Sequence, residues 1–128
     1  MIRKALHGDI SGIVGLIESN PDTLLPRSHK EIADLLDWFW VAEEEGAVIG
    51  CCCLEIYSPK IAEVRTLAVA PEHRGDGIGR SLVEHAVADA QKRNIREVLV
   101  VTSALKFFEK LNFGPCLHEK YALFWNGK

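Results

Sequence analysis

The hydrophobic and polar residues of this sequence follow two periods, and each period predicts one kind of secondary structure. Apolar residues recur every three to four positions in four stretches, which we expect to form helices: 8–20, 28–38, 77–94 and 103–111. Asp9 is a candidate N-cap of the first helix, and the second begins with a Ser-x-x-Glu capping box at Ser28 and Glu31.

The remaining apolar stretches are expected to form strands: 1–6, 38–57, 61–70, 96–102 and 121–125. The second stretch is a hairpin of two strands about the acidic turn Glu44–Gly46, and the stretch 96–102 is typical of a buried strand. The elements follow the order βααβββαβαβ, which favours a mixed sheet with helices on both faces. We therefore predict an α/β (α+β, mixed-sheet) fold in which residues 1–128 form a single domain.

Composition and charge exclude several classes of function. The 128 residues are 48% hydrophobic and 26% charged, with a formal net charge of −3, so nothing global attracts the chain to nucleic acid or to an anionic membrane. No apolar run approaches the roughly 20 residues of a membrane-spanning helix, and the N-terminal stretch is unlike a signal peptide. We therefore expect a cytoplasmic protein.

The four cysteines and five histidines do not indicate a metal site. Cys51, Cys52 and Cys53 are adjacent on a predicted strand, so their side chains point to alternating faces and cannot share one zinc ion. Cys116 and the histidines follow no ligand spacing. We expect no metal, and we interpret the cysteines as small buried hydrophobic residues in a reducing cytoplasm.

The segment between the strand 61–70 and the helix 77–94 contains glycines at positions 75, 77 and 79. A strand, a glycine-rich turn and a helix form an anion site, because the first helical turn leaves backbone N–H groups unpaired and glycine lacks the Cβ atom that would hold a phosphate away. The three glycines also allow unusual φ and ψ angles, and Arg74 and Arg80 are candidate cations. The alternative is a tight surface turn. The spacing fits neither a P-loop nor a dinucleotide-binding G-x-G-x-x-G turn.

Two segments resemble the GNAT superfamily of N-acetyltransferases. The segment LAVAPEHRGDGIGRSLVEHA resembles its acetyl-CoA-binding motif, R-x-x-G-x-G/A, and FFEKLNFG resembles a later family segment. The resemblance implies a GNAT-like acyl-CoA N-acyltransferase fold, with acetyl-CoA as co-substrate. Its pyrophosphate would lie on the turn, and its pantetheine arm would pair like an extra strand. The cofactor-binding residues would be Leu67, Ala68, Val69, Arg74, Gly75, Asp76, Gly77, Ile78, Gly79 and Arg80.

Further segments are similar to the acetyltransferase domain of N-acetylglutamate synthases: LLPRS at 24–28, AEVRTLAV at 62–69 and VVTSALKFFEKLNF. This similarity implies transfer of an acetyl group to the α-amino group of glutamate or a similar acidic amino acid, in a ternary complex, as in arginine biosynthesis. Two alternatives stay open: a GNAT enzyme for another amine (a polyamine, an aminoglycoside or a protein N-terminus), and a non-catalytic acyl-CoA-binding module. The second is suggested by Phe108, which stands where many members carry a tyrosine acid. A homodimer is also expected from the apolar end at 121–125.

Few groups are needed for the transfer. Glu63 is the candidate general base, and period 2 places it on one strand face with Arg65, Leu67 and Val69. A surface salt bridge between Glu63 and Arg65 is the alternative, and it would make Glu63 a weaker base. Thr102 is a candidate acid for the leaving thiolate, or an ordinary strand-end threonine.

Arginines are the candidate substrate-binding residues. Arg27 follows a proline that stiffens its loop, and its guanidinium group can bind a carboxylate with two hydrogen bonds. Arg65 is the second candidate. The alternative for Arg27 is a solvated loop residue.

Overall fold

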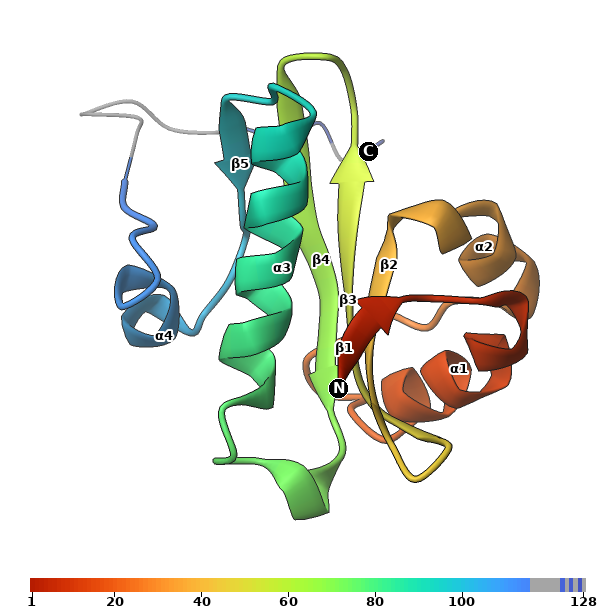
Figure 1. Ribbon diagram of the computed structural model, residues 1–128. Coiled ribbons are helices and arrows are strands. Elements are labelled where there is room, and N and C mark those ends of the chain that lie inside the picture. Colours follow the sequence, from red (N-terminus) through yellow and green to blue (C-terminus); the bar gives the residue numbers. More distant parts are fainter. Residues whose placement is uncertain (116–122, 124, 126, 128) are drawn as a thin grey trace.

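A five-stranded sheet forms the centre of the computed structural model, which describes residues 1–115, 123, 125 and 127 (Figure 1). The strands lie side by side in chain order: β1 (Ile2–Lys4), β2 (Phe39–Glu44), β3 (Ala47–Ile56), β4 (Ile61–Val69) and β5 (Glu97–Leu99). Neighbouring strands are antiparallel except β4 and β5, which are parallel. The expected mixed sheet is therefore confirmed, whereas the strand expected at 121–125 falls mainly on residues outside the described part, as does Cys116.

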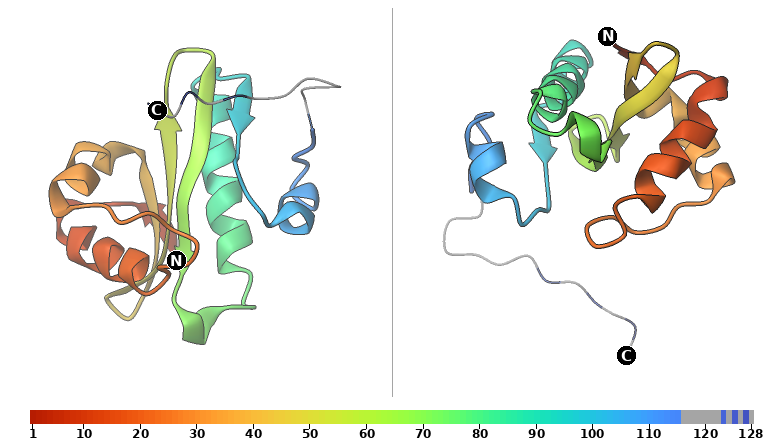
Figure 2. Two further views of the ribbon diagram at one scale, coloured as in Figure 1. Left: turned by 180° about the vertical axis from the view of Figure 1, so that it is seen from behind. Right: turned by 90° about the horizontal axis from the view of Figure 1, so that it is seen from below.

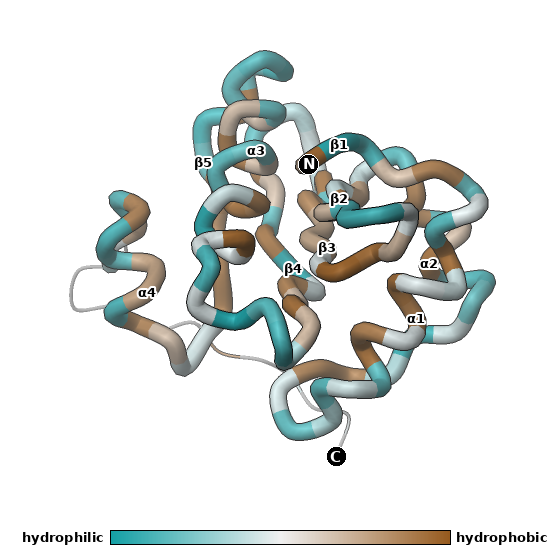
Figure 3. Tube along the Cα trace, turned by 60° about the horizontal axis from the view of Figure 1, so that its bottom comes forward, coloured by the Kyte–Doolittle hydropathy of each residue, from teal (hydrophilic) through white to brown (hydrophobic). Residues whose placement is uncertain are grey.

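Helices cover both faces of this sheet, as expected. In the view from below, α1 (Ile10–Glu18) and α2 (His29–Asp34) lie on one side of the strands, and α3 (Ile78–Lys92) and α4 (Leu105–Glu109) lie on the other (Figure 2, right). Each side has its own hydrophobic core, and Cys51 and Cys53 belong to the first while Cys52 belongs to the second. These three thiols are free and buried, and desolvation raises the pKa of each. The cysteines therefore act as core residues of β3, which runs between the helices in Figure 3.

Of the two helix caps expected from the sequence, the one before α2 is present and the one before α1 is not. The capping box before α2 is confirmed, because Ser28 Oγ accepts from Glu31 N (3.1 Å) and Glu31 Oε1 accepts from Ser28 N (2.9 Å). Asp9 makes no side-chain cap bond to α1. Its Oδ2 accepts from Leu6 N (2.7 Å) and from Arg3 Nη1 (2.8 Å) instead.

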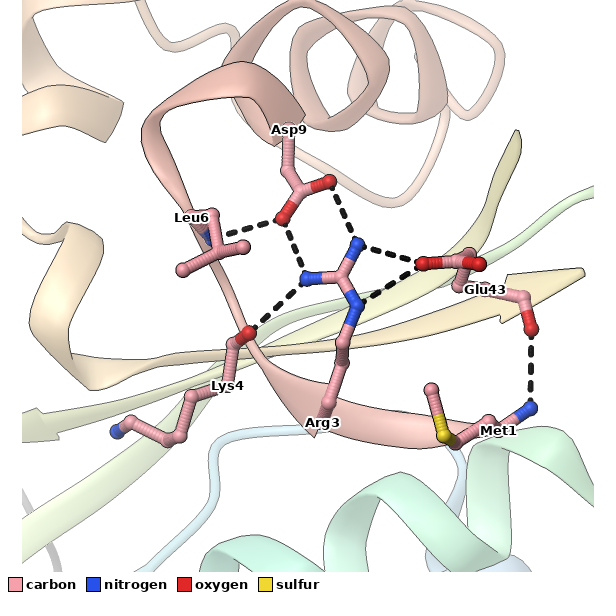
Figure 4. A network of polar contacts seen from close by, with 6 residues as sticks. All are labelled: Met1, Arg3, Lys4, Leu6, Asp9 and Glu43. Carbon is pink, nitrogen blue, oxygen red and sulfur yellow. Dashed lines mark hydrogen bonds and ion pairs between the residues drawn. The ribbon is translucent and has the colours of Figure 1, made fainter. Parts of the chain in front are cut away.

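The carboxylate of Asp9 belongs to a polar network that joins β1, the turn before α1, and β2 (Figure 4). Arg3 binds both oxygens of Asp9 (2.8 and 3.0 Å), and its Nη2 also donates to Glu43 Oε1 (2.9 Å). The hydrogen bonds from Arg3 hold the pKa of Asp9 below its ordinary value, although partial burial opposes this shift. The network therefore ties the first strand of the sheet to the start of α1.

A β-bulge in β4 corrects the expected arrangement of its side chains. Pairing with β3 shifts register between Arg65 and Ala68, and Thr66 adopts a left-handed backbone conformation (φ 54°). Before the bulge, Ala62 and Val64 contribute to the α3-side core; after it, Leu67 packs on that side. Because the bulge adds a residue, Glu63 and Arg65 do not share a face with Leu67 and Val69.

The strand expected at 96–102 is also shorter than predicted and is not buried. It ends at Leu99, and Val101 is 72% exposed. It pairs with β4 only at Ile61–Glu63, because the two strands diverge beyond this point (Figure 1). Apolar composition alone therefore overstated the length of this strand, since a strand needs a partner for its backbone groups.

Close packing of α3 against β3 places the N-terminus of α3 at the end of β4. Gly50 of β3 lies under this contact: a Cβ atom there would meet Leu82 Cδ1 at 3.0 Å, Ile78 Cγ2 at 3.1 Å and the carbonyl oxygen of Ala68 at 3.4 Å. The absence of a side chain at Gly50 lets the first two turns of α3 approach the sheet. The glycine-rich turn thereby lies beside the divergent part of β4.

Candidate active site

The glycine-rich turn ends at Gly77, which is the N-cap of α3 in a left-handed conformation (φ 82°). Gly75 also has a positive φ (91°), but Gly79 does not, so two of the three glycines use the conformational freedom that glycine allows. Gly79 lies within the first turn of α3, and a Cβ atom there would make ordinary contacts, the nearest with Phe107 at 3.6 Å. This explains why the final position of the motif accepts alanine as well as glycine.

Backbone N–H groups at the start of α3 are available to an anion. The first helical hydrogen bond runs from Ser81 N to Gly77 O (3.1 Å), and no side chain of the described residues caps the helix. The N–H groups of Ile78, Gly79 and Arg80 therefore have no helical acceptor, and the helix dipole adds partial positive charge. This geometry suits a phosphate group.

Charged side chains surround the turn. Arg74 is exposed, and its Nη2 donates to Oδ1 of Asn20 (2.5 Å), which follows α1. Arg80 forms a loose ion pair with Glu84 (3.7 Å), and Asp76 lies 3.6 Å from His73. Asn20, a residue that the sequence did not single out, thus holds Arg74 beside the turn.

The divergence of β4 from β5 leaves part of the β4 backbone without a neighbouring strand among the described residues. Ala68 and Val69 pair with Cys51 and Gly50 of β3 along one edge. No described strand pairs with the other edge beyond Glu63. An extended ligand with amide groups can satisfy the backbone groups of this edge.

The backbone of β4 is strained near the point where β4 diverges from β5. The positive φ of Thr66 is unusual for a β-branched residue, and its carbonyl accepts a weak hydrogen bond from Cys51 Sγ (3.4 Å). Such strained positions concentrate at functional sites. The bulge turns the chain of β4 just before the segment that we expected to bind the pantetheine arm.

A cluster of polar side chains, four of them charged, lies on the α2 side of the sheet. We call it the carboxylate–arginine cluster, and its members are Arg27, Glu55, Tyr57, Glu63 and Arg65. Glu55 and Glu63 are directly opposite each other on β3 and β4, an arrangement that is unfavourable for two like charges unless each has a partner. Arg65 Nη1 donates to Glu55 Oε2 (3.1 Å), and Arg27 Nη2 lies 3.8 Å from the same oxygen. Tyr57 Oη donates to Glu63 Oε1 (2.5 Å).

These contacts decide between the alternatives for the cluster. Arg65 forms its ion pair with Glu55, so the expected alternative, a salt bridge between Glu63 and Arg65, is wrong. The Arg27 side chain is only 12% exposed, which contradicts its alternative as a solvated loop residue. Glu55 and Tyr57 were missed in the sequence, although the alternation of β3 places position 55 on the same face as Cys53.

Electrostatic contacts within the cluster keep Tyr57 neutral and Arg65 positively charged. Desolvation and the hydrogen bond to Glu63 raise the pKa of Tyr57 to about 12, so its hydroxyl group stays protonated and donates near neutral pH. Partial burial lowers the pKa of Arg65, but Tyr57, Glu55 and Glu63 more than offset this effect and raise it overall. Arg65 therefore remains a cation.

The candidate acid, Thr102, lies on the β5 side of the region where β4 and β5 diverge. Thr102 follows β5 in an exposed segment, and its Oγ1 accepts from Ala104 N (2.9 Å) before α4. This bond uses the hydroxyl oxygen as an acceptor and leaves its O–H as a donor. Phe108 is 5% exposed and packs edge-to-face on Phe107 and Phe113, so its role is in the core.

Neither a metal-binding cluster nor a membrane-spanning helix is found in the described part of the structure. No group of three or more His, Cys, Asp or Glu side chains in this part of the structure is arranged to hold a metal ion. None of the helices there is long and apolar enough to cross a membrane.

Comparison with known proteins agrees with this geometry. The sequence profile of the acetyltransferase (GNAT) domain family matches residues 36–115. The chain therefore belongs to the GNAT acetyltransferase family and is an N-acetyltransferase, which excludes the alternative of a non-catalytic module. The resemblance seen in the sequence is confirmed.

Curated relatives include amino-acid acetyltransferases. An uncharacterized N-acetyltransferase of Chlorobaculum tepidum is 39% identical over 114 residues, which are 88% of this chain and 74% of the relative. The amino-acid acetyltransferase of Mycobacterium tuberculosis is 30% identical over 117 residues, 88% of this chain and 67% of that protein. The chain spans only 27% of some longer relatives, such as the amino-acid acetyltransferase of Salmonella typhi.

Solved structures show the same fold. Rv2747 from Mycobacterium tuberculosis, in complex with CoA and NLQ, matches with a TM-score of 0.84 and 29% identity over 88% of this chain and 70% of that one. N-acetylglutamate synthase from Neisseria gonorrhoeae, complexed with coenzyme A and N-acetyl-glutamate, matches with a TM-score of 0.79 and 26% identity. That match covers 88% of this chain and 27% of the synthase.

Proposed function

We propose that this N-acetyltransferase moves the acetyl group of acetyl-CoA to the α-amino group of glutamate or a similar acidic amino acid, directly within a ternary complex. The observation that carries the acceptor is the carboxylate–arginine cluster, where Arg27 and Arg65 come from distant segments and converge on one carboxylate oxygen of Glu55. Two guanidinium groups beside a candidate base suit an acceptor that carries carboxylates next to its amine.

The start of α3 and the free edge of β4 support the position of acetyl-CoA. Its pyrophosphate would lie on the backbone of residues 75–80, with Arg74 and Arg80 as nearby cations. The pantetheine arm would pair with Leu67, Ala68 and Val69. Family neighbours crystallised with CoA support this placement.

The reaction removes two protons from the substrate ammonium nitrogen and adds one to the sulfur of CoA. Glu63 would take a proton from the substrate ammonium group, directly or through water, so that the neutral nitrogen attacks the thioester carbonyl carbon. The C–N bond forms, the C–S bond breaks, CoA leaves as a thiolate, and the nitrogen, positively charged after the attack, releases its second proton to water. Thr102 would donate a proton to that thiolate or hold a water molecule that does so.

A thiol-release assay over a panel of amines tests the acceptor. Glutamate should release thiol faster than a polyamine, an aminoglycoside or a peptide with a free N-terminus. Glutamine should be a poorer acceptor than glutamate, because its amide cannot form an ion pair. A clear preference for a cationic amine, or equal use of glutamine and glutamate, would refute the proposed acceptor while leaving the acetyltransferase class intact.

Replacement of Arg27 tests the residue that supports this acceptor. Arg27→Ala should raise KM for glutamate at least tenfold, because a charge-assisted hydrogen bond contributes about 1.5–3 kcal/mol. KM for acetyl-CoA should stay nearly constant. Arg93→Ala is the matched control, since Arg93 pairs with Asp89 at the other end of α3 and lies outside the cluster. An unchanged glutamate KM in Arg27→Ala contradicts the assignment.

A further inference from the structure

Glu55 is the residue of the carboxylate–arginine cluster with most partners. Its Oε2 lies 3.1 Å from Arg65 Nη1, 3.8 Å from Arg27 Nη2 and 3.5 Å from Tyr57 Oη. The Glu55 side chain is 17% exposed. Water therefore screens these contacts only in part.

The charges of the cluster sum to zero because of Glu55. Arg27 and Arg65 contribute two positive charges, and Glu55 and Glu63 contribute two negative ones. Without the charge of Glu55, the cluster would have a net charge of +1. Glu55 therefore already neutralises one of the two arginines when the carboxylate of an acceptor approaches them.

We infer that Glu55 is a specificity-determining residue: it limits the charge that the two arginines offer and so sets how strongly the cluster prefers a dicarboxylic acceptor over a monocarboxylic one. This inference rests on the proposed function, because it places the acceptor carboxylates at Arg27 and Arg65. Glu55 also anchors the mostly buried guanidinium group of Arg27, which needs a counter-ion. Glu55 thus orders the cluster and also weakens its attraction for a second carboxylate.

The variant Glu55→Gln separates these two effects. The amide oxygen of glutamine still accepts hydrogen bonds from the arginines, while the negative charge is removed. Glutamate has one negative charge more than glutamine, so its attraction to the cluster increases more when the charge of Glu55 is removed. At the separations of neighbouring side chains in a partly screened site, we expect the ratio of kcat/KM for glutamate to that for glutamine to rise about tenfold.

The ratio of kcat/KM for glutamate to kcat/KM for glutamine is the useful measurement, because general damage to the fold or to catalysis lowers both values equally and cancels from the ratio. The control Asp34→Asn makes the same change of charge at an exposed residue of α2 and should alter the ratio less than twofold. If Glu55 is only an anchor, Glu55→Gln will weaken both acceptors equally. An unchanged ratio therefore overturns the inference.

A binding measurement makes the result independent of turnover. Isothermal titration of N-acetylglutamate and N-acetylglutamine into the CoA-loaded protein should show the same rise in the ratio of affinities in Glu55→Gln. If neither glutamate nor glutamine is acetylated but this ratio still rises, the proposed function fails and the role of Glu55 stands. If the ratio of affinities is unchanged, or neither compound binds to either protein, the role of Glu55 is refuted.

Discussion

At the scale of single residues, the two opposed carboxylates of the cluster differ in their partners. Glu55 contacts two arginines, whereas Glu63 accepts a hydrogen bond from the neutral hydroxyl group of Tyr57. Glu55 is thus engaged in ion pairs, whereas no arginine of the described residues forms an ion pair with Glu63. Glu63 is therefore the better candidate for the base.

Replacement of Glu63 tests this role. Glu63→Gln should lower kcat by about 10²-fold, the usual scale for loss of a general base. The loss should shrink at high pH, because more of the amine then arrives without its proton. Rates measured from pH 6 to pH 10 check this expectation, with Glu97→Gln on the exposed side of β5 as the control. A loss of only a few fold, equal at all pH values, would leave Glu63 without a catalytic role.

Asp9 offers a prediction about stability and pH. Its pKa is lowered in the folded protein, so its contribution to stability is present above its ordinary pKa and is lost as the pH falls through the lowered value. Asp9→Asn should reduce the free energy of unfolding at pH 7 by about 2 kcal/mol, because charge-assisted hydrogen bonds from Arg3 are lost. The difference from the wild type should narrow as the pH falls from the ordinary pKa of an aspartate through the lowered value.

Urea unfolding at several pH values measures this difference. Asp34→Asn is the control, because Asp34 pairs with Lys30 on the exposed surface of α2, where water screens the ion pair and its contribution to stability is small. A difference for Asp9→Asn that is independent of pH would contradict the linkage.

At the scale of elements, the beginning of α3 depends on the conformation of one glycine. Gly77 has a positive φ, and nothing lies within 4 Å of the position that a Cβ atom would take. A side chain at this position is therefore disfavoured by the backbone and not by a neighbouring atom. Gly79, two residues later, is helical and has no such constraint.

The pair of substitutions Gly77→Val and Gly79→Ala tests this difference. Gly77→Val should lower the free energy of unfolding by about 1–3 kcal/mol, because a β-branched residue is strained at φ 82°. It should also weaken acetyl-CoA binding more than tenfold. Gly79→Ala should keep both properties close to the wild type. Thermal unfolding and isothermal titration give the two values, and equal effects of the two substitutions would refute the argument.

At the scale of the whole molecule, the sheet and α3 bring the two halves of the site together. The bulge in β4 places Glu63 and Arg65 on the α2 side and Leu67 on the α3 side. The amine acceptor and the cofactor are thus expected to approach from different faces and to meet where β4 leaves β5. This arrangement depends on the close contact of α3 with Gly50.

Substitution of Gly50 tests that dependence. In Gly50→Ala, the new methyl group would lie 3.0 Å from Leu82 Cδ1, so this side chain or α3 must move by a few tenths of an ångström, which should cost about 1–3 kcal/mol of stability and weaken acetyl-CoA binding. Gly15→Ala is the control: Gly15 is exposed in α1 with nothing within 4 Å, so alanine should raise stability by up to about 1 kcal/mol. Unchanged affinity in a destabilised Gly50→Ala protein would show that α3 is positioned independently of this contact.

Much of the fold could be predicted because its signals are local. The capping box of α2, the turn between β2 and β3, and the glycines before α3 each depend on residues within a few positions of one another. The mixed sheet follows from the order of apolar stretches, and the motif with Arg74, Gly77 and Gly79 identified the family. These features need no knowledge of distant contacts.

The sequence by itself thus determined the class of fold, the family and the start of α3, whereas only the tertiary structure decided which side chains form the carboxylate–arginine cluster. The extra residue at Thr66 reverses the face of β4 and is invisible to a period of two. Glu55 is the partner of Arg65 because two strands pair in one register, and Arg27 joins them from a loop. Ion pairs are set by distances in space, and residues far apart in the chain acquire those distances only when the sheet and its helices are packed.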